Sequence, residues 1–183
     1  MIKKIIILFL ILIDISFAKN LDDIKNLYSN GKYYKACSLS GGLYTAYKDD
    51  EVFLNLYADS CLKADMINRL MLPIIKLYKT KSARENAAYF STILYEKKML
   101  YHALCDGVDI SYINLPKTNY ILSKIFDKFI RGKYDFKNGS YWFSDDTNID
   151  LKYKLSIEKN YNTKKMYLRT YKNNKIIKTR VYW

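Results

Sequence analysis

The sequence has few residues that break regular structure and few that carry catalytic chemistry. Its 183 residues include six glycines, two prolines, three cysteines and one histidine. So little glycine and proline excludes a collagen-like or low-complexity chain. A single histidine leaves little material for a histidine-based metal or catalytic site. Aromatic residues make up 16% of the chain, which excludes a disordered tail.

The motifs of several enzyme classes are also missing. The chain has no glycine-rich phosphate loop, Gly-x-Ser-x-Gly elbow, His-Glu-x-x-His helix or Cys-x-x-Cys pair. Adjacent carboxylates occur at Asp22-Asp23, Asp49-Asp50 and Asp145-Asp146, at expected helix starts or in a turn, where acids act as caps. We therefore expect no catalytic residue, no cofactor and no metal site. An enzyme would have to be built around His102 and Cys105, which share one helix face.

The longest apolar run lies at the N-terminus. Lys3-Lys4 precede the nine apolar residues Ile5 to Ile13, and Ser16-Phe17-Ala18 places small residues before Lys19. This pattern predicts a secretory signal peptide over residues 1–18, cleaved after Ala18. An uncleaved anchor is the alternative, although nine residues fall short of the ~20 that cross a bilayer. We expect a periplasmic or secreted chain from Lys19 with no transmembrane segment.

Apolar residues recur at helical spacing from Leu21 to about Arg131. Acids at Asp22-Asp23 begin the first helix, and Gly31 ends it. The same signals predict antiparallel helical hairpins, with Pro73 interrupting one helix and Gly132 ending the last. The expected helices cover residues 33–47, 49–62, 66–79, 83–96, 99–105 and 117–131.

One segment of the helical region recurs in part later in the chain. Leu27-Tyr28-x-x-Gly31-x-Tyr33-Tyr34-x-Ala36 is matched in part by Leu94-Tyr95 and Tyr101-x-Ala103, 67 residues later. Two repeats of 34 residues would span about 68 residues. From Lys19 to Asp109 the chain therefore resembles tetratricopeptide and Sel1-like helical repeats. The resemblance implies a groove for a protein partner, and an irregular helical bundle is the alternative.

The cysteines fit a helical hairpin. Cys37 lies twelve residues before Asp49, at the expected turn, and Cys61 lies twelve residues after it. Equal distances from the turn place two residues level with each other in antiparallel helices. We therefore predict a disulfide bond between Cys37 and Cys61. Sel1-like repeats use a similar disulfide. Cys105 would then have no cysteine partner within the chain. The alternative is three buried free thiols.

After Gly132 the apolar period changes from 3.6 to 2 residues. Asn138-Gly139 and Asn173-Asn174 predict tight hairpin turns. We therefore predict an α+β fold, with a helical-repeat-like domain over residues 19–132 and a basic antiparallel β-meander over residues 133–183. The expected strands cover residues 133–137, 140–143, 149–158, 164–172 and 175–183.

The second turn predicts the strand register and therefore the two faces of the sheet. Arg169 would lie opposite Lys178, a like-charge pair that a sheet selected for folding alone would avoid. The buried face would carry Met166, Leu168, Thr170, Ile177, Thr179 and Val181 with the Leu151 series. The opposite face would carry the candidate binding residues Lys152, Lys154, Lys165, Tyr167, Arg169, Lys178, Arg180 and Tyr182.

Charge gathers in the same region. The chain carries a net charge of +13, of which residues 151–183 supply +9. Tyrosines alternating with Lys and Arg suit an anionic ligand, because rings stack and cations neutralise charge. The alternative is a solvated face in which Lys protects strand edges and AT-rich codons inflate the Lys content.

These features predict a non-catalytic periplasmic adaptor or scaffold that binds another envelope protein. A pilus, a secretion system or a flagellar motor would fit such a component. The alternative function is a module for an anionic envelope ligand, bound on the basic face of the sheet. A lipid headgroup, a lipopolysaccharide or an acidic glycan would serve, and nucleic acid is the least favoured anion for an exported protein.

Overall fold

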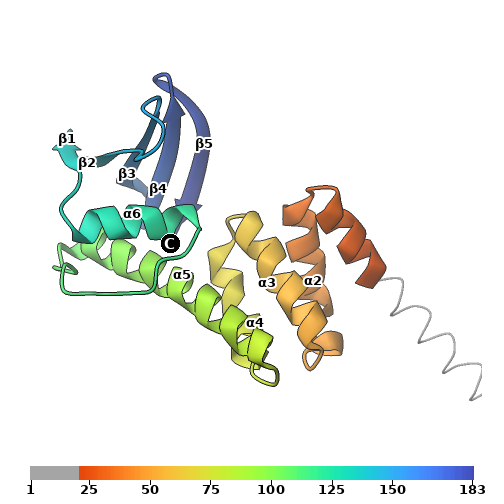
Figure 1. The fold of residues 1–183 in the computed structure, drawn as a ribbon. Helices are drawn as coiled ribbons and strands as arrows, with labels where there is room; N and C mark the ends of the chain where they lie inside the picture. The colour runs from red at the N-terminus through yellow and green to blue at the C-terminus, as the bar shows by residue number, and fades with distance from the viewer. Residues whose placement is uncertain (1–20) are drawn as a thin grey trace, which may run out of the picture. The chain divides into compact units, whose positions relative to one another are not determined.

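The computed structural model describes residues 21–183, so the predicted signal peptide lies outside the described residues. The chain is α+β, with helices first and an antiparallel sheet last, as predicted (Figure 1). It divides into two compact units, one ending at Ala87 and one running from Ala88 to Trp183. The change of secondary structure falls near residue 132, so the second unit combines helices with the sheet. Within residues 21–183, no helix has the length and apolarity that a bilayer crossing requires.

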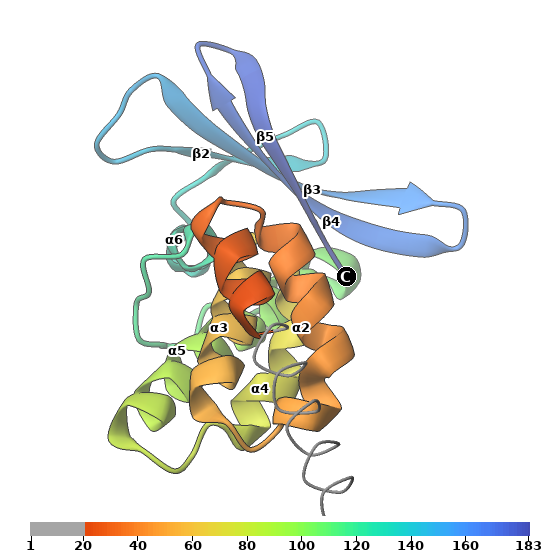
Figure 2. The same ribbon diagram turned by 90° about the vertical axis from the view of Figure 1, so that its right-hand side faces the viewer.

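The first unit is a set of short antiparallel helices. Residues 21–29 are helical, and Gly31 adopts a positive φ of 70° that ends this helix. Figure 2 shows the next two helices side by side. Asp50 begins the second of them, because its carboxylate accepts from the amides of Val52 and Phe53. The elements that follow are α2 (Tyr33–Tyr47), α3 (Glu51–Lys63), η1 (Ile67–Leu70) and α4 (Met71–Lys76).

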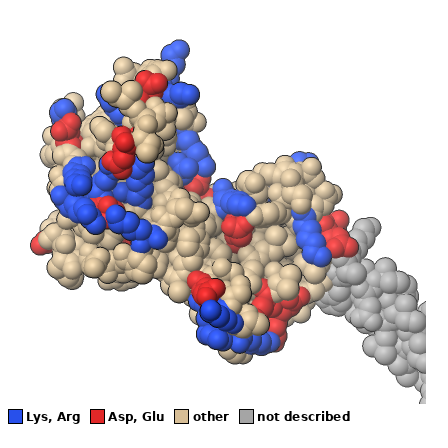
Figure 3. Space-filling model, viewed as in Figure 1, with Lys and Arg blue, Asp and Glu red and all other residues tan. Residues whose placement is uncertain are grey.

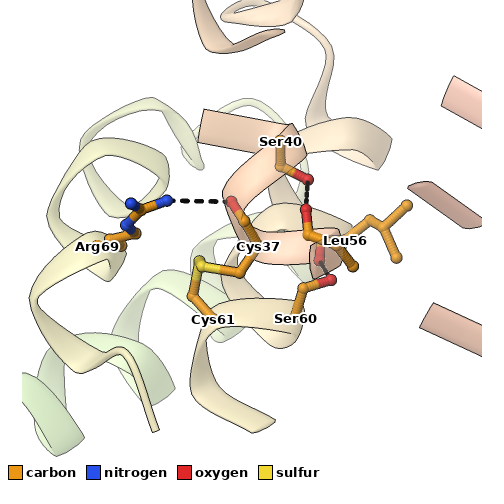
Figure 4. Close-up of a disulfide and its surroundings, with 7 residues drawn as sticks. Cys37, Ser40, Leu56, Ser60, Cys61 and Arg69 are labelled. Atoms are coloured by element: carbon orange, nitrogen blue, oxygen red, sulfur yellow. Dashed lines mark hydrogen bonds between the residues drawn. A yellow bond between two sulfur atoms is a disulfide. The ribbon is translucent and has the colours of Figure 1, made fainter. Parts of the chain in front are cut away.

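The predicted disulfide is present. Cys37 on α2 and Cys61 on α3 are bonded, with their Cα atoms 4.8 Å apart, and both residues are fully buried (Figure 4). Ala36 and Ala58 are also buried and let the two helices approach closely. Cys105 is a free thiol.

Three predicted helix boundaries are wrong. Residues 83–96 and 99–105 belong to one helix, α5 (Lys81–Asp106), because Lys97 and Lys98 are good helix formers. The helix predicted over residues 66–79 is interrupted at Leu70 and not at Pro73. Pro73 lies in the first turn of α4, where a backbone N–H would have no partner within the helix, so its absence costs no hydrogen bond. The last helix, α6 (Ile121–Ile130), begins four residues later than predicted, and the Ser123 hydroxyl in its first turn accepts from the Thr118 amide of the preceding loop.

The sheet is a meander in which neighbouring strands pair in sequence order. Asn138 and Gly139 both adopt positive φ, as do Asn173 and Asn174, which confirms both predicted turns. The five strands are β1 (Asp135–Lys137), β2 (Ser140–Ser144), β3 (Leu151–Asn160), β4 (Thr163–Lys172) and β5 (Lys175–Tyr182).

One face of the sheet is covered by α6 and is called the inner face here. Phe129 of α6 meets Tyr141 of β2 edge-on, with ring centres 5.0 Å apart. The Tyr120 hydroxyl before α6 lies 3.2 Å from the Tyr182 hydroxyl of β5. The inner face carries the buried side chains Phe143, Tyr153, Leu155, Met166, Leu168, Thr170 and Tyr182.

The predicted register between β4 and β5 holds for two pairs and is then wrong. Tyr171 pairs with Ile176 as expected, but Thr170 pairs with Lys178 rather than Ile177. A β-bulge places Ile177 outside the ladder and turns the rest of β5 over. The residues of β4 lie on the faces that were predicted for them. On β5, Ile177, Thr179 and Val181 were predicted to be buried and are not core residues.

Candidate functional site

The face of the sheet opposite α6 is the main candidate site and is called the outer face below. Strand pairing brings residues of β2, β3 and β4 together on it. Five of the predicted binding residues lie here, namely Lys152, Lys154, Lys165, Tyr167 and Arg169. Ser156, Glu158, Trp142 and Tyr171 lie on the same face.

The other three predicted binding residues do not lie on the outer face. The bulge in β5 moves Lys178, Arg180 and Tyr182 to the inner side of the sheet, opposite Thr170, Leu168 and Met166 respectively. Tyr182 is buried there, and Arg180 lies 3.4 Å from the Thr170 hydroxyl. A single extra residue reverses every side chain beyond it, so period-2 reasoning could not detect the change.

Aromatic rings and cations are interleaved on the outer face. The rings of Trp142 and Tyr171 meet across β3 with their centres 5.2 Å apart and their planes at 44°. The Lys154 ammonium lies 5.5 Å from the centre of the Trp142 ring. The Arg169 guanidinium lies 4.8 Å from the centre of the Tyr167 ring. These are cation–π distances, so the positive charges are held next to aromatic surfaces.

Sequence reasoning missed Trp142 and Tyr171. Both could have been placed from the pattern, because Trp142 is two residues beyond Ser140 and Tyr171 two residues beyond Arg169. Residues two apart on a strand share a face. The predicted binding residues were chosen mainly by charge, so the set did not include these two rings.

The predicted like-charge pair of Arg169 with Lys178 is wrong, because the bulge shifts the register, and Arg169 forms an ion pair with Glu158 instead. Arg169 donates from both terminal nitrogens to the two carboxylate oxygens of Glu158, across β3 and β4. This bidentate hydrogen bonding lowers the pKa of Glu158 and raises the pKa of Arg169. On β5, Arg169 lies opposite Thr179 rather than a cation.

Lys152 and Lys154 remain without such a partner. Among the described residues, no carboxylate forms an ion pair with either lysine. On β3 and β4 the outer face therefore has four cationic side chains against one carboxylate, and that carboxylate is already occupied by Arg169. The face has a net positive charge that the fold does not cancel.

A network of charges lies on the inner side, beside α6. Lys124 donates to Asp145 at 2.6 Å, and the Tyr153 hydroxyl donates to the same carboxylate at 2.5 Å. Burial opposes ionisation of Asp145, but these hydrogen bonds and those from Thr147 hold the pKa of its carboxyl well below the ordinary value. Burial and the adjacent Asp145 charge raise the pKa of Tyr153.

A cavity of about 460 Å³ opens beside this network, and its charges are balanced. Lys117, Lys124 and Lys128 approach it, and each forms an ion pair with an aspartate, at 3.4, 2.6 and 2.5 Å respectively. Figure 3 shows blue and red side chains interleaved on the second unit. Because the cations are already paired, this cavity is a weaker candidate for an anion than the outer face.

Asp145 should be important for the stability of the second unit. Its side chain is only 5% exposed and accepts from Lys124, Tyr153 and the loop amides of Thr147 and Asn148. We expect Asp145→Asn to lower the free energy of unfolding by about 2 kcal/mol at pH 7, because charge-assisted hydrogen bonds are lost. Denaturant unfolding followed by tryptophan emission measures this.

The pH dependence of the stability tests whether the Asp145 charge causes this effect. The pKa of Asp145 is lowered in the folded state, so its contribution is present above the unfolded pKa and is lost as acid protonates the folded carboxyl. The difference between wild type and Asp145→Asn should therefore shrink on acidification. A difference that stays constant down to the acid transition would contradict this account. Exposed Asp135→Asn serves as the control, with an expected change within about 0.5 kcal/mol.

A buried carboxyl lies between α5 and α6. Glu96 is 2% exposed, its Oε1 atom accepts from the Ser123 hydroxyl at 2.7 Å, and its Oε2 atom has no partner among the described residues. Burial is the main reason that the pKa of Glu96 is raised to about 7, with a further contribution from Asp127. Its neighbour Lys97 is also buried, donates to the Trp183 carbonyl at 2.5 Å, and has a pKa lowered to about 8 by burial.

His102 and Cys105 have different partners. The His102 Nδ1 atom lies 2.8 Å from an Asp106 carboxylate oxygen on the exposed end of α5, and half-buried Cys105 contacts Tyr101 instead. Between residues 21 and 183, no three His, Cys, Asp or Glu side chains gather into a metal-ligand cluster.

The first unit offers a different kind of surface. Met71, Leu72 and Ile75 project from α4, and Ile75 is 71% exposed. A groove of about 390 Å³ beside Leu72 is lined by Gly41 and Gly42 of α2 and by Arg69. Exposed apolar side chains of this size often mark protein interfaces.

No family model, curated protein or solved structure matches this chain. The tetratricopeptide and Sel1-like resemblance therefore stays a prediction. In the structure its first segment spans the turn at Gly31, whereas its second segment lies within the continuous helix α5.

Proposed function

We propose that the protein is a non-catalytic adaptor of the cell envelope and that it binds an anionic envelope component on the outer face of its sheet. The uncancelled positive charge of that face is the observation that carries the proposal. Lys152 and Lys154 have no ion-pair partner in the described chain, while Trp142 and Tyr171 provide aromatic surface beside them. Ring surface next to cations that lack an ion-pair partner suits an anion that also has a flat group.

Protection of strand edges does not account for these lysines. Charges that prevent aggregation are needed on edge strands, where backbone groups are unpaired. Lys152 and Lys154 lie on β3, which is the central strand and pairs with β2 and β4. A central strand has no free edge to protect, so their charge is available for a ligand.

An envelope location agrees with two features. The expected signal peptide over residues 1–18 would direct the chain to export. The buried Cys37–Cys61 disulfide is a bond of the kind that persists in oxidising compartments. Both support the periplasmic or secreted location that the proposal requires.

Charge reversal tests the proposal. We expect Lys152→Glu with Lys154→Glu to reduce binding to isolated cell envelopes by about tenfold or more at low salt, because two attractive charges become repulsive. Co-sedimentation with envelope fractions measures the bound protein. The control pair Lys175→Glu and Lys178→Glu makes the same charge change on the inner side of the sheet and should leave binding within about twofold.

The salt dependence of binding distinguishes between the two candidate binding surfaces. Binding through Lys152 and Lys154 should fall steeply as salt screens the charges. Binding that survives both high salt and charge reversal would contradict the proposal. It would favour a second candidate, a protein partner held by the exposed apolar residues Met71, Leu72 and Ile75 on α4.

A further inference from the structure

We infer that the anionic component is an acidic polysaccharide, whose sugar rings stack on Trp142 and Tyr171 while its acidic groups meet Lys152 and Lys154. This inference rests on the proposed function and names the ligand class of the same face. It is carried by the arrangement of the aromatic rings relative to the cations.

The two rings are direct neighbours, tilted at 44° to each other, although they come from distant positions in the sequence. Trp142 projects from β2 and Tyr171 from β4, and the rings meet over β3, with centres 5.2 Å apart. Neither ring belongs to the core, which lies on the inner face. The C–H groups of a sugar carry partial positive charge and pack favourably against the electron-rich face of an aromatic ring.

The cations lie where the acidic groups of such a chain would fall. The Lys154 ammonium is 5.5 Å from the centre of the Trp142 ring, and Lys152 follows on the same face of β3, about 6.6 Å along the strand. Lys152 is directly opposite Tyr171 in the strand ladder. Each ring therefore has a lysine beside it, so ring stacking and charge neutralisation can occur on the same sugar unit.

A lipid bilayer fits this face less well. Peripheral binding to a bilayer combines cations with aliphatic or aromatic side chains that enter the acyl region. On the outer face, aliphatic side chains are confined to the edge strand β5, where Ile176 lies opposite Tyr171 and Val181 opposite Tyr167. The outer-face residues of β3 and β4 over 152–158 and 165–171 include none: they are Lys152, Lys154, Ser156, Glu158, Lys165, Tyr167, Arg169 and Tyr171. Hydroxyl and ammonium donors dominate, which suits the hydroxyls and carboxylates of a glycan.

Tryptophan emission gives a direct test. The chain has two tryptophans, so Trp183→Phe leaves Trp142 as the only reporter. We expect polygalacturonate to change the Trp142 emission of this full-chain variant in a saturable way, and neutral dextran to leave it unchanged. Adding Lys154→Gln or Tyr171→Ala should weaken polygalacturonate binding about tenfold. The controls are Lys178→Gln, on the inner side, and Tyr112→Ala, at an exposed tyrosine between α5 and α6, and both should leave binding within about twofold.

The other outcomes are separable. Binding to phosphatidylcholine vesicles that contain phosphatidylglycerol, lost in Lys154→Gln but kept in Tyr171→Ala, with no response to polygalacturonate, would overturn the polysaccharide and leave the anion-binding function standing. No response to either polyanion would overturn the inference and the proposed function together. Circular dichroism of each variant establishes that the sheet is still folded, and Lys154→Gln provides a variant that removes no ring.

Discussion

Replacing Glu96 by glutamine should stabilise the second unit by about 3 kcal/mol at pH 8 and leave its stability nearly unchanged at pH 4. The carboxyl of Glu96 is buried between α5 and α6, and its Oε2 atom has no hydrogen-bond partner in the described chain. Glutamine has the same shape, can still accept from the Ser123 hydroxyl, and is never charged.

The sign follows from the pKa of Glu96. Burial raises this pKa from 4.5 to about 7, so the folded state holds its proton more tightly than the unfolded state. The stability of the wild type should therefore be complete below pH 4.5, fall as the pH rises towards 7, and stay low above it. Each pKa unit corresponds to about 1.4 kcal/mol, which gives the expected difference between the two proteins.

Denaturant unfolding at pH 4 and pH 8 measures the effect, with tryptophan emission as the signal. Trp142 and Trp183 both lie after Ala88, so the emission follows the second unit alone. Asp135→Asn, at an exposed carboxylate of the same unit, is the control and should change the stability by less than about 0.5 kcal/mol. An advantage for Glu96→Gln that is equal at both pH values would show that folding does not raise the pKa of this carboxyl.

The features that the sequence alone predicted are those set by local chemistry. Asn138-Gly139 and Asn173-Asn174 require positive φ values, and both turns formed. Alternation along β3 and β4 identified the side chains of the core and most of the cationic face. The Cys37–Cys61 pairing followed from equal distances to one helical turn.

The features that sequence reasoning missed depend on contacts between distant segments. The β-bulge at Ile177 leaves no mark in a period-2 pattern, yet it moves Lys178, Arg180 and Tyr182 to the inner side. The partnership of Arg169 with Glu158 depends on the register of β3 against β4, which no turn signal fixed in advance. The burial of Glu96 depends on α6 returning to pack on α5.

Removing the disulfide should have an effect of similar size in the other unit. We expect Cys37→Ala with Cys61→Ala to lower the free energy of unfolding of the first unit by about 3 kcal/mol, because the bond closes a loop between residues 24 apart in sequence. Much of this loss comes from the greater freedom of the unfolded chain. The rest comes from buried sulfur atoms that packed between α2 and α3.

The two units can be followed separately in one experiment. Residues 21–87 contain no tryptophan, so their unfolding appears in helical circular dichroism and not in tryptophan emission. The double variant should therefore lose stability in the circular dichroism transition and keep its emission transition. A reductant should destabilise the wild type by a similar amount and have no effect on the double variant.

Cys105→Ala is the matched control, because it removes a half-buried thiol that forms no disulfide. Its expected change is below about 1 kcal/mol and should appear in the emission transition of the second unit. If reduction left the wild type unchanged, the cross-link would not constrain the unfolded chain.

A helical unit this small has a limited core, with Phe53, Leu54 and Tyr57 at its centre, and depends on the cross-link to hold α2 against α3. Exposure to a reducing compartment should then unfold the helical unit first and leave the anion-binding sheet intact.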